Sequence, residues 1–432
     1  MRKLLSVGLT LIFLAGIAGC SLFRPSNRSR PQPSGPPVTR KSEAVPKAPE
    51  KAAPFNVAVF ATRKRLPSYH VAVFAPLYLS QVSDPEAPEN FPSIARTALP
   101  GLEFYEGIQI ALDTLRAEGY HLDVDVYDTK SEKPGLEETL RSPSMSSVNL
   151  ILGSVNMPGF RLLSSFARSH QVNFISVTYP NDGDLTDDPF LVICNSTLRT
   201  HCEAIHHYVQ ENFGKNKNIL LFYRNTPQEK RSAGYILESW KDDPGPKIPI
   251  HEVEWMDSIS TRDLSSHLVR GKNNVCIVSS LNESAARNIT SKLASLAGGY
   301  EINVMGMPNW DGIRDFFGPA YRGIGIFYST PYYNEKKDRY SDYINASYSE
   351  TYKVRPTDMV FKGFEAMYYF CGLMQLDGIY FNPFLNDSRY QTITPFDFEP
   401  VYHHPGSLTP DYFENKYLYF IKIFDGAIYK AG

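Results

Sequence analysis

After residue 70 the hydrophobic positions of the chain follow two different spacings. Short runs such as "HVAVFAPL" (70–77) and "VNLILGS" (148–154) are apolar at nearly every position. The longer stretch 101–119 places its apolar residues on a 3.6-residue period, which is the spacing of a helix with one face in a core. Because continuous apolar runs are typical of strands covered on both faces, the pattern predicts strands and helices in alternation.

This alternation continues to about residue 330. Further strands are predicted at 122–128, 172–179, 190–195, 218–223, 249–255, 274–280, 302–307 and 323–329, and further helices at 158–171, 197–214, 229–241, 261–270 and 282–299. Such an order favours parallel sheets with right-handed crossovers. About ten strands over some 365 residues exceed one domain of usual size. We therefore expect an α/β fold with two doubly wound parallel-sheet lobes.

The last third of the chain has a different pattern. Two helices are predicted within 337–354 and 356–378, and the segments 390–401 and 416–430 alternate with a period of two. That alternation predicts an antiparallel hairpin with a long connection. The pentapeptide "VAVFA" occurs at 57–61 and again at 71–75. We expect the second copy to be the first strand, and the first copy to be an extra edge strand or a loosely held segment.

The first residues have the features of a targeting signal. Arg2 and Lys3 precede an uncharged stretch that ends at Gly19 and is shorter than the roughly 20 residues of a membrane span, so residues 1–19 are predicted to be a signal peptide. Ile17-Ala18-Gly19-Cys20 resembles a lipobox, which implies removal of 1–19 and diacylation of Cys20. Several acyl chains would anchor the protein stably. An ordinary signal peptide with a chance cysteine is the alternative.

Residues 20–67 are predicted to be a disordered, Pro-rich tether. They are rich in Pro, Ser, Lys and Arg and contain few large apolar residues, so they cannot bury enough surface to offset the entropy of ordering. Residues 21–67 hold ten Lys/Arg against two Asp/Glu, whereas 68–432 hold 32 against 44. The acidic body argues against nucleic acid as a partner.

Motifs typical of enzymes and metal proteins are either absent from the sequence or have an unsuitable spacing. No Gly-rich phosphate loop precedes a helix and no Gly-x-Ser-x-Gly elbow occurs. His201, Cys202, His206 and His207 share one predicted helix, but only Cys202 and His206 have the i, i+4 spacing that chelation favours. We expect no catalytic residue, no metal and no cofactor. The cysteines at 194, 202, 276 and 371 lie in apolar surroundings, where free thiols are the common outcome.

The order and spacing of several segments resemble the type 1 periplasmic-binding-protein family, which includes branched-chain amino acid receptors of transport systems. The similarity spans residues 68–432 and rests on "VAVFAPL", "FYEGIQIALDTL", "DVDVYDT", "ILGSVNMPG", "VNFISVTYP" and "PTDMVFKGFEAMYYF". It implies two lobes joined by three crossing segments, with a small polar ligand in the cleft between them. We place lobe 1 at about 68–200 and 355–395, and lobe 2 at about 215–354. The Pro-rich loop 78–100 departs from the family pattern and is either a lid or a partner-contact surface.

Open α/β sheets bind ligands beyond the carboxyl ends of their strands. Residues that follow the predicted strands are therefore the candidates for ligand binding: Ser154, Asn156, Ser176 and Tyr179 in lobe 1, and Tyr223, Ser279, Trp310 and Tyr328 in lobe 2. Trp310 and Tyr328 would form an apolar wall, and Asp311 would pair with a ligand amine. Ser280 and Glu283 fit a capping box of the helix that follows them.

Two functions are compatible with these features. The first is a lipid-anchored solute-binding protein of the bacterial cell envelope, with its body in the periplasm or at the cell surface. Its lobes would close around a small polar ligand, such as an amino acid or peptide, for a transporter or sensor. The second is a scaffold or regulator of cell-wall synthesis that has the same fold and a degenerate cleft, as lipoproteins that activate cell-wall synthases do.

Overall fold

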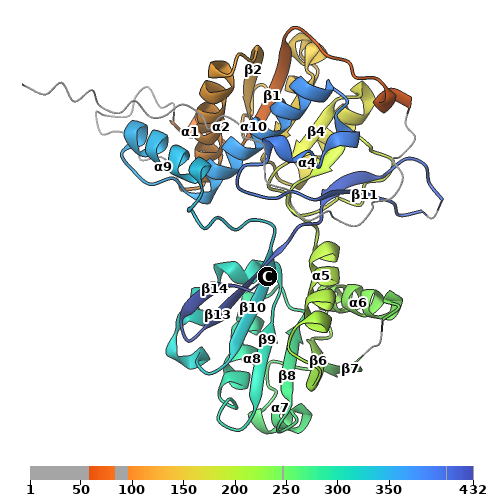
Figure 1. Ribbon diagram of the computed structural model, residues 1–432, viewed down its shortest axis with the longest axis vertical. Coiled ribbons are helices and arrows are strands. Elements are labelled where there is room, and N and C mark those ends of the chain that lie inside the picture. Colours follow the sequence, from red (N-terminus) through yellow and green to blue (C-terminus); the bar gives the residue numbers. More distant parts are fainter. Residues whose placement is uncertain (1–57, 83–95, 246–247, 405, 432) are drawn as a thin grey trace, which may run out of the picture.

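The computed structural model describes residues 58–82, 96–245, 248–404 and 406–431. The predicted signal peptide, Cys20 and the tether up to residue 57 lie outside the described residues, as does most of the loop 78–100. Within the described chain, no helix is long and apolar enough to cross a membrane. The described residues form two lobes, each built on a seven-stranded sheet (Figure 1).

The first sheet has the strand order β11-β12-β5-β4-β3-β1-β2. Its strands are β1 (Tyr69–Ala75), β2 (Leu122–Asp128), β3 (Leu150–Gly153), β4 (Asn173–Ser176), β5 (Leu191–Ile193), β11 (Phe398–Val401) and β12 (Tyr412–Asn415). All neighbours are parallel except β11 and β12. The helices of this lobe are α1 (Leu79–Val82), α2 (Leu99–Ala117), α3 (Leu136–Leu140), α4 (Met157–His170), α9 (Arg339–Tyr352) and α10 (Asp358–Asp377).

The second sheet has the order β14-β13-β10-β9-β8-β6-β7. Its strands are β6 (Lys217–Tyr223), β7 (Ile250–Glu254), β8 (Asn273–Val278), β9 (Glu301–Met305), β10 (Gly325–Thr330), β13 (Tyr419–Phe424) and β14 (Ala427–Lys430). The pairs from β7 to β10 are parallel, and β13 is antiparallel to both β10 and β14. The helices are α5 (Leu198–Glu211), α6 (Pro227–Asp242), α7 (Thr261–His267) and α8 (Glu283–Ala294).

Short 3-10 turns complete the two lobes. They are η1 (Ala58–Ala61), η2 (Pro143–Ser147), η3 (Pro308–Gly312), η4 (Arg314–Phe317), η5 (Pro319–Tyr321), η6 (Asn382–Phe384) and η7 (Ser388–Tyr390). Helix α7 begins with a capping box between Ser260 and Asp263. Helix α8 instead begins with Asn282, whose side chain accepts from the Ala285 N–H, so the capping box predicted for Ser280 and Glu283 is wrong.

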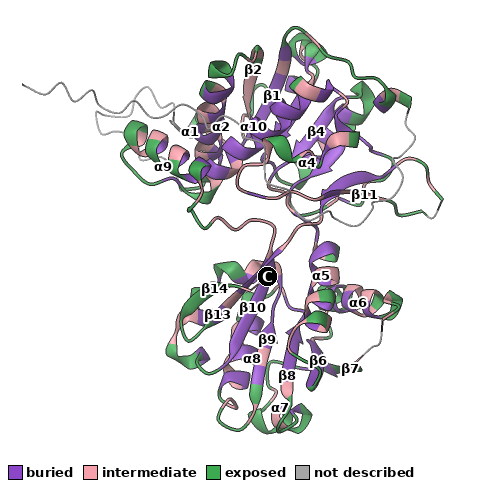
Figure 2. Ribbon diagram, in the orientation of Figure 1, coloured by how far each residue is buried: buried purple, intermediate pink, exposed green. Residues whose placement is uncertain are grey.

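The two faces of the first sheet bury different residues of the same strands. Val71 and Val73 pack with α2 and α10 on one face, while Ala72 and Phe74 pack with α4 on the other. This alternation follows from the period of two in a strand, and it explains why the strand sequences are apolar at every position. Figure 2 shows the buried sheets between more exposed helices. The predicted α/β architecture of two doubly wound lobes is confirmed.

Three segments cross between the lobes: β5 to α5 (194–197), β10 to α9 (331–338) and β12 to β13 (416–418) (Figure 1). Helix α9 packs on α2 in the first lobe, whereas the sequence-based division placed it in lobe 2. The crossing therefore lies before α9, not after it.

Two further expectations differ from the structure. The predicted hairpin between 390–401 and 416–430 does not form: β11 pairs with β12 in one sheet, and β13 pairs with β14 in the other. Residues 58–61 of the first "VAVFA" copy form the 3-10 turn η1 and no strand. The ring of Phe60 packs against Phe190 at a centroid distance of 5.3 Å, which holds this turn on the first lobe.

Candidate functional site

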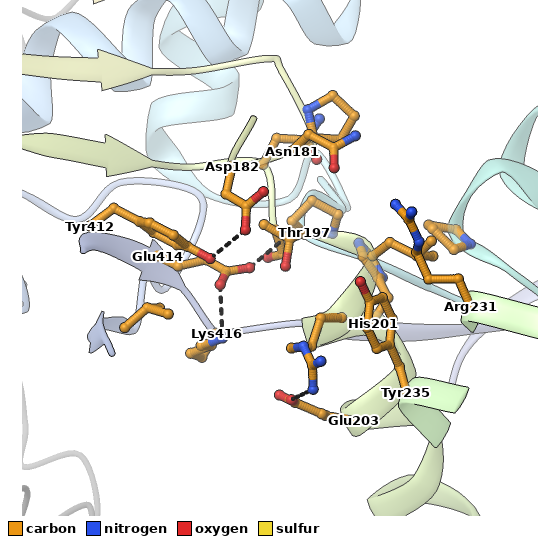
Figure 3. Close-up of a pocket in the computed structure, with 18 of the residues that line it drawn as sticks. Asn181, Asp182, Thr197, His201, Glu203, Arg231, Tyr235, Tyr412, Glu414 and Lys416 are labelled. Atoms are coloured by element: carbon orange, nitrogen blue, oxygen red, sulfur yellow. Dashed lines mark hydrogen bonds and ion pairs between the residues drawn. The ribbon is translucent and has the colours of Figure 1, made fainter. Parts of the chain in front are cut away.

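A cleft of about 1260 Å³ lies where the two lobes face each other. Residues from both lobes and from all three crossing segments line it. They include Asn181, Asp182, Asp184, Asn195, Thr197, Arg199, His201, Glu203, Arg231, Tyr235, Asn309, Asp311, Tyr332, Lys362, Tyr402, His403, Tyr412, Glu414 and Lys416. Figure 3 labels residues from both lobes around the open space, among them Asp182, Arg231 and Glu414. The cleft walls are mostly polar, which suits a ligand that carries charges or hydrogen-bonding groups.

An ion pair at the start of α5 ties two crossing segments together. The carboxylate of Glu414, only 1% exposed, accepts from the Thr197 N–H at 2.6 Å and from Lys416 Nζ at 2.8 Å. Lys416 also donates to Thr200 Oγ1 at 2.5 Å (Figure 3 shows the pair and Thr197). Because buried charges persist only when they are paired and hydrogen-bonded, this network fixes the geometry of the hinge.

A second network connects the loop after β4 with the strand pair β11 and β12. The Tyr412 hydroxyl donates to Asp182 Oδ2 at 2.9 Å (Figure 3). His403 Nδ1 lies 2.8 Å from Asp411 Oδ2, and its Nε2 lies 3.8 Å from Asp182 Oδ2. Burial opposes ionisation of Asp411, but hydrogen bonds from two backbone N–H groups and from His403 lower its pKa overall. The rim of the cleft is thus held by charge-assisted contacts.

His201 is an uncharged polar residue in the wall of the cleft. Its ring is 2% exposed, and Nδ1 lies 2.8 Å from Ser329 Oγ. Burial lowers the pKa of His201 to about 3, since desolvation disfavours the imidazolium. The side chain is therefore uncharged at neutral pH.

Two charged side chains on the second lobe face the cleft without an ion-pair partner. Within the described chain, neither Arg231 on α6 nor Asp311 on η3 forms an ion pair within 4.0 Å. By contrast, Arg199 pairs with Glu238 at 3.0 Å. The unpaired guanidinium and carboxylate are available to a ligand that carries both signs of charge.

A smaller chamber of about 30 Å³ adjoins the cleft. Cys194, Asn195, Pro331, Tyr332, Lys362, Glu365 and Thr394 are among the residues that line it. Glu365 on α10 is 2% exposed, and burial raises its pKa to about 7 against the hydrogen bonds that it accepts. The chamber therefore contains an acid that titrates close to neutral pH.

None of the eight residues predicted to bind ligand lines the cleft. In lobe 1, Ser154 Oγ lies 3.1 Å from Thr178 Oγ1, and Asn156 caps α4 by accepting from the Gly159 N–H. Ser176 is fully buried. Tyr179 packs on Phe160 at a centroid distance of 4.8 Å.

The residues of lobe 2 that were predicted to bind ligand also make their contacts within their own lobe. The Tyr223 hydroxyl donates to Glu252 at 3.1 Å, and Ser279 Oγ donates to the backbone carbonyls of Phe222 and Glu229. Trp310 is fully buried and donates from Nε1 to the Ser280 carbonyl at 3.1 Å. Tyr328 is 6% exposed, and burial raises its pKa to about 12. Neither aromatic ring forms the predicted apolar wall of the cleft.

Some of the cleft residues lie close in sequence to those that the sequence suggested. Asn181 and Asp182 follow the predicted strand 172–179, and Asn309 and Asp311 follow 302–307. The strand-end rule thus leads to loops that reach the cleft, and Asp311, the predicted partner of a ligand amine, is among the residues that line it. Tyr402, Tyr412, Glu414 and Lys416 have no comparable signal, because only the pairing of β12 with β5 brings them to the site.

One group of residues has the spacing of a partial metal site. Ligand atoms of His206, His207 and Asp243 lie within 4.8 Å of one another. His206 Nδ1 is 2.8 Å from Ser239 Oγ, and Nε2 is 3.4 Å from Asp243 Oδ2. Of the four residues considered on the predicted helix, His201 and Cys202 do not belong to this group. It lies between α5 and α6, and none of its members lines the cleft.

Neither a protein-family model nor a curated protein sequence matches the chain. Solved structures do match it. A branched-chain amino acid ABC transporter protein from Rhodospirillum rubrum is 13% identical with a TM-score of 0.61, and the alignment covers 84% of this chain and 100% of that one. An ABC transporter substrate-binding protein from Desulfitobacterium hafniense is 11% identical with a TM-score of 0.55, over 84% and 100% of the two chains. The protein has the type 1 periplasmic-binding-protein fold.

The same fold is found in a longer protein. LpoA from Haemophilus influenzae is 10% identical with a TM-score of 0.50, and the alignment covers 85% of this chain and 60% of LpoA. At these identities the comparisons establish the periplasmic-binding-protein fold and leave the ligand open. The loops that form the cleft are therefore interpreted from their own chemistry.

Proposed function

We propose that the protein is a lipid-anchored solute-binding protein of the bacterial cell envelope, whose lobes close around a zwitterionic ligand such as an amino acid or short peptide. The interlobe cleft is the observation that carries this proposal. It is about 1260 Å³ in volume, and the unpaired charges of Arg231 and Asp311 face it. These charges complement a ligand with a free carboxylate and a free amine.

Closure follows from the three crossing segments. An open and a closed form exchange by bending these segments, and a ligand that contacts both lobes stabilises the closed form. The cleft has residues of lobe 1, such as Asp182 and Lys362, opposite residues of lobe 2, such as Arg231 and Asp311. A transporter or sensor in the membrane would recognise the closed shape, and acyl chains on Cys20 would keep the protein close to it.

The site residues favour binding over catalysis. His201 and Ser329 are a base and a hydroxyl within hydrogen-bond reach, the arrangement of an activated nucleophile. However, Ser329 is fully buried, and a His201 pKa of about 3 makes the imidazole a weak base at neutral pH. We assign this pair a structural role and the protein no enzymatic activity.

Thermal unfolding in the presence of an amino acid and dipeptide library tests the proposal. A ligand that binds only the folded state at about one hundred times its Kd adds about 2.7 kcal/mol to the free energy of unfolding. A hit should also reduce the radius of gyration measured by small-angle X-ray scattering. Unchanged melting temperatures across the library would contradict a receptor for amino acids or dipeptides.

A scaffold or regulator of cell-wall synthesis is the second candidate. The chain shares its fold with LpoA, and two exposed apolar side chains favour contact with a protein partner: Tyr402 in the cleft wall and Leu408 in the connection between β11 and β12, which are 39% and 69% exposed. Such a protein would retain a cell-wall synthase in a pull-down from membrane extract, and Leu408→Ser would weaken that retention. If the protein neither binds a solute from the library nor retains a synthase, both candidates are contradicted.

A further inference from the structure

The 30 Å³ chamber and the large cleft meet at one place in the hinge. Asn195, Pro331, Tyr332 and Lys362 line both cavities. A space of that size holds about one or two water molecules, or one small end group of a longer molecule. The chamber can therefore receive the terminal group of a ligand whose remainder lies in the cleft.

Lys362 places a cation at this junction. It belongs to the first turns of α10, and its Nζ lies 5.0 Å from the centroid of the Tyr332 ring, a cation–π distance. Within the described residues, its ammonium has no ion pair within 4.0 Å and no hydrogen-bond acceptor within 3.5 Å. Burial lowers its pKa, against the attraction of Asp358, Asp311 and Glu365 at longer range.

Glu365, one helical turn beyond Lys362, is already saturated by other donors. Its Oε1 accepts from Thr392 Oγ1, from the Ile393 N–H and from the Thr394 N–H at 3.2, 3.1 and 2.5 Å, and its Oε2 accepts from Thr394 Oγ1 at 2.8 Å. The segment 392–394 therefore holds this carboxyl group. Glu365 does not neutralise Lys362 through a direct contact.

The Tyr332 hydroxyl is a second donor at the junction. It is shielded from solvent and forms no hydrogen bond within 3.5 Å in the described chain, and the side-chain amide of Asn334 is the polar group next to it. A buried hydroxyl without a partner is costly, so a group that accepts its hydrogen bond is favoured here. The Lys362 ammonium over the Tyr332 ring, together with the hydroxyl of the same tyrosine, offers a cation and a hydrogen-bond donor to an anionic oxygen pair.

The geometry points to a carboxylate subsite: Lys362 and Tyr332 bind the terminal carboxylate of a ligand whose remaining part occupies the interlobe cleft. This inference rests on the proposed function and specifies that the carboxylate end of the solute enters the hinge and pairs with Lys362, in place of Arg231. A monoanion fits better than a phosphate, because Asp311, Asp358 and Glu365 surround the single ammonium and repel a second negative charge. The amine of the ligand is then directed towards the second lobe.

Propionate and its neutral isostere propionamide are suitable probes, because they fill the subsite without requiring a particular solute. Binding of each to the full chain is measured by saturation-transfer difference NMR. We expect propionate to bind in the millimolar range and propionamide at least about tenfold more weakly, the loss that follows removal of a charge-assisted contact. Equal binding of the two probes, or no binding of propionate, would overturn the subsite.

Two variants assign the effect to the named residues. Lys362→Gln should weaken propionate binding at least about tenfold, and Tyr332→Phe a few-fold. Lys230→Gln removes an exposed lysine that lines neither cavity and should leave the affinity unchanged. Thermal melting checks that each variant is folded. If Lys362→Gln binds propionate as tightly as the unaltered protein does, the assignment is wrong.

The outcome separates this inference from the proposed function. If propionate binding depends on Lys362 but no member of the amino acid and dipeptide library raises the melting temperature, the subsite is supported and the amino acid receptor is contradicted. Library hits whose affinity is unchanged by Lys362→Gln keep the receptor and contradict the subsite.

Discussion

Gly107 on α2 and Gly363 on α10 lie at the same helix crossing, each directly against the backbone of the other helix. A Cβ atom on Gly107 would be 2.0 Å from the Val360 carbonyl oxygen, and one on Gly363 would be 2.0 Å from the Phe104 carbonyl oxygen. No side chain can move away to relieve either contact. The two glycines thus set the distance between the two longest helices that cover one face of the first sheet.

Gly363→Ala should destabilise the protein, because the added methyl group forces the two helices apart. We expect the free energy of unfolding, measured with urea, to fall by about 1–3 kcal/mol or more. Gly234→Ala on α6 is the matched control, since a Cβ there meets nothing within 4 Å. In a helix interior that change should raise stability by about 0.4–1 kcal/mol. Equal effects of the two substitutions would show that the crossing is not tight.

Glu365→Gln should change how stability depends on pH. Glu365 has a folded-state pKa of about 7 instead of 4.5, so an unfolded chain loses this proton first as the pH rises. Stability therefore falls between about pH 4.5 and 7 by up to about 3 kcal/mol. Glutamine keeps an acceptor for the two backbone N–H groups and does not titrate.

The measurement for Glu365 is the difference in unfolding free energy between the unaltered protein and Glu365→Gln across pH 5 to 8. The variant should gain relative stability as the pH rises. Asp188, whose pKa burial also raises to about 7, is present in both proteins, so its effect cancels. A difference that does not vary with pH would contradict a raised pKa.

His201 should have the opposite effect in acid. Its folded-state pKa is about 3 instead of 6.5. Between these two values the imidazole is protonated in the unfolded chain and neutral in the folded chain. Stability is lost as the pH falls below 6.5, by about 2–3 kcal/mol at pH 4.5. His201→Asn retains a polar group near Ser329 and should remove this slope. His207→Gln, at an exposed position on the same helix, should leave the slope in place.

Glu414→Gln should weaken the hinge. The amide oxygen can still accept from the Thr197 N–H, but Lys416 loses its counter-ion, and its side chain is only 23% exposed. We expect a loss of about 1–3 kcal/mol, less than for a fully buried pair because Lys416 keeps Thr200. Glu137→Gln breaks an exposed pair with Arg141 and should cost less than about 0.5 kcal/mol. Similar losses in both variants would argue against a structural role for the hinge pair.

The sequence predicts the strands and helices well where burial on both faces or on one face leaves a periodic pattern. It does not decide on which lobe an element packs. Helix α9 follows a crossing segment, and its amphipathic pattern would suit either lobe, so only the contact with α2 settles its place. The short strand β12 is likewise invisible locally, because its pairing with β5 joins residues about 220 positions apart.

The loops that the sequence suggests for the site reach the cleft, but the eight residues predicted to bind ligand do not line it. Side chains at the ends of strands, such as Ser176 and Ser279, still follow the strand alternation and point into the lobe. Residues free of that alternation, such as Asn181 and Asp311, begin one or more positions later and face the cleft. Distance from the strand end is not sufficient, because Asn156, Tyr179 and Trp310 also lie beyond their strands and make contacts within their own lobes.

Residues 398–430 supply edge strands to both sheets. Neither half of the molecule is therefore a contiguous stretch of chain that could be produced alone by cutting at a single point. Neither sheet is therefore complete until this segment has been synthesised. A protease cut or frameshift within it would loosen both halves at once, including the half that was made first.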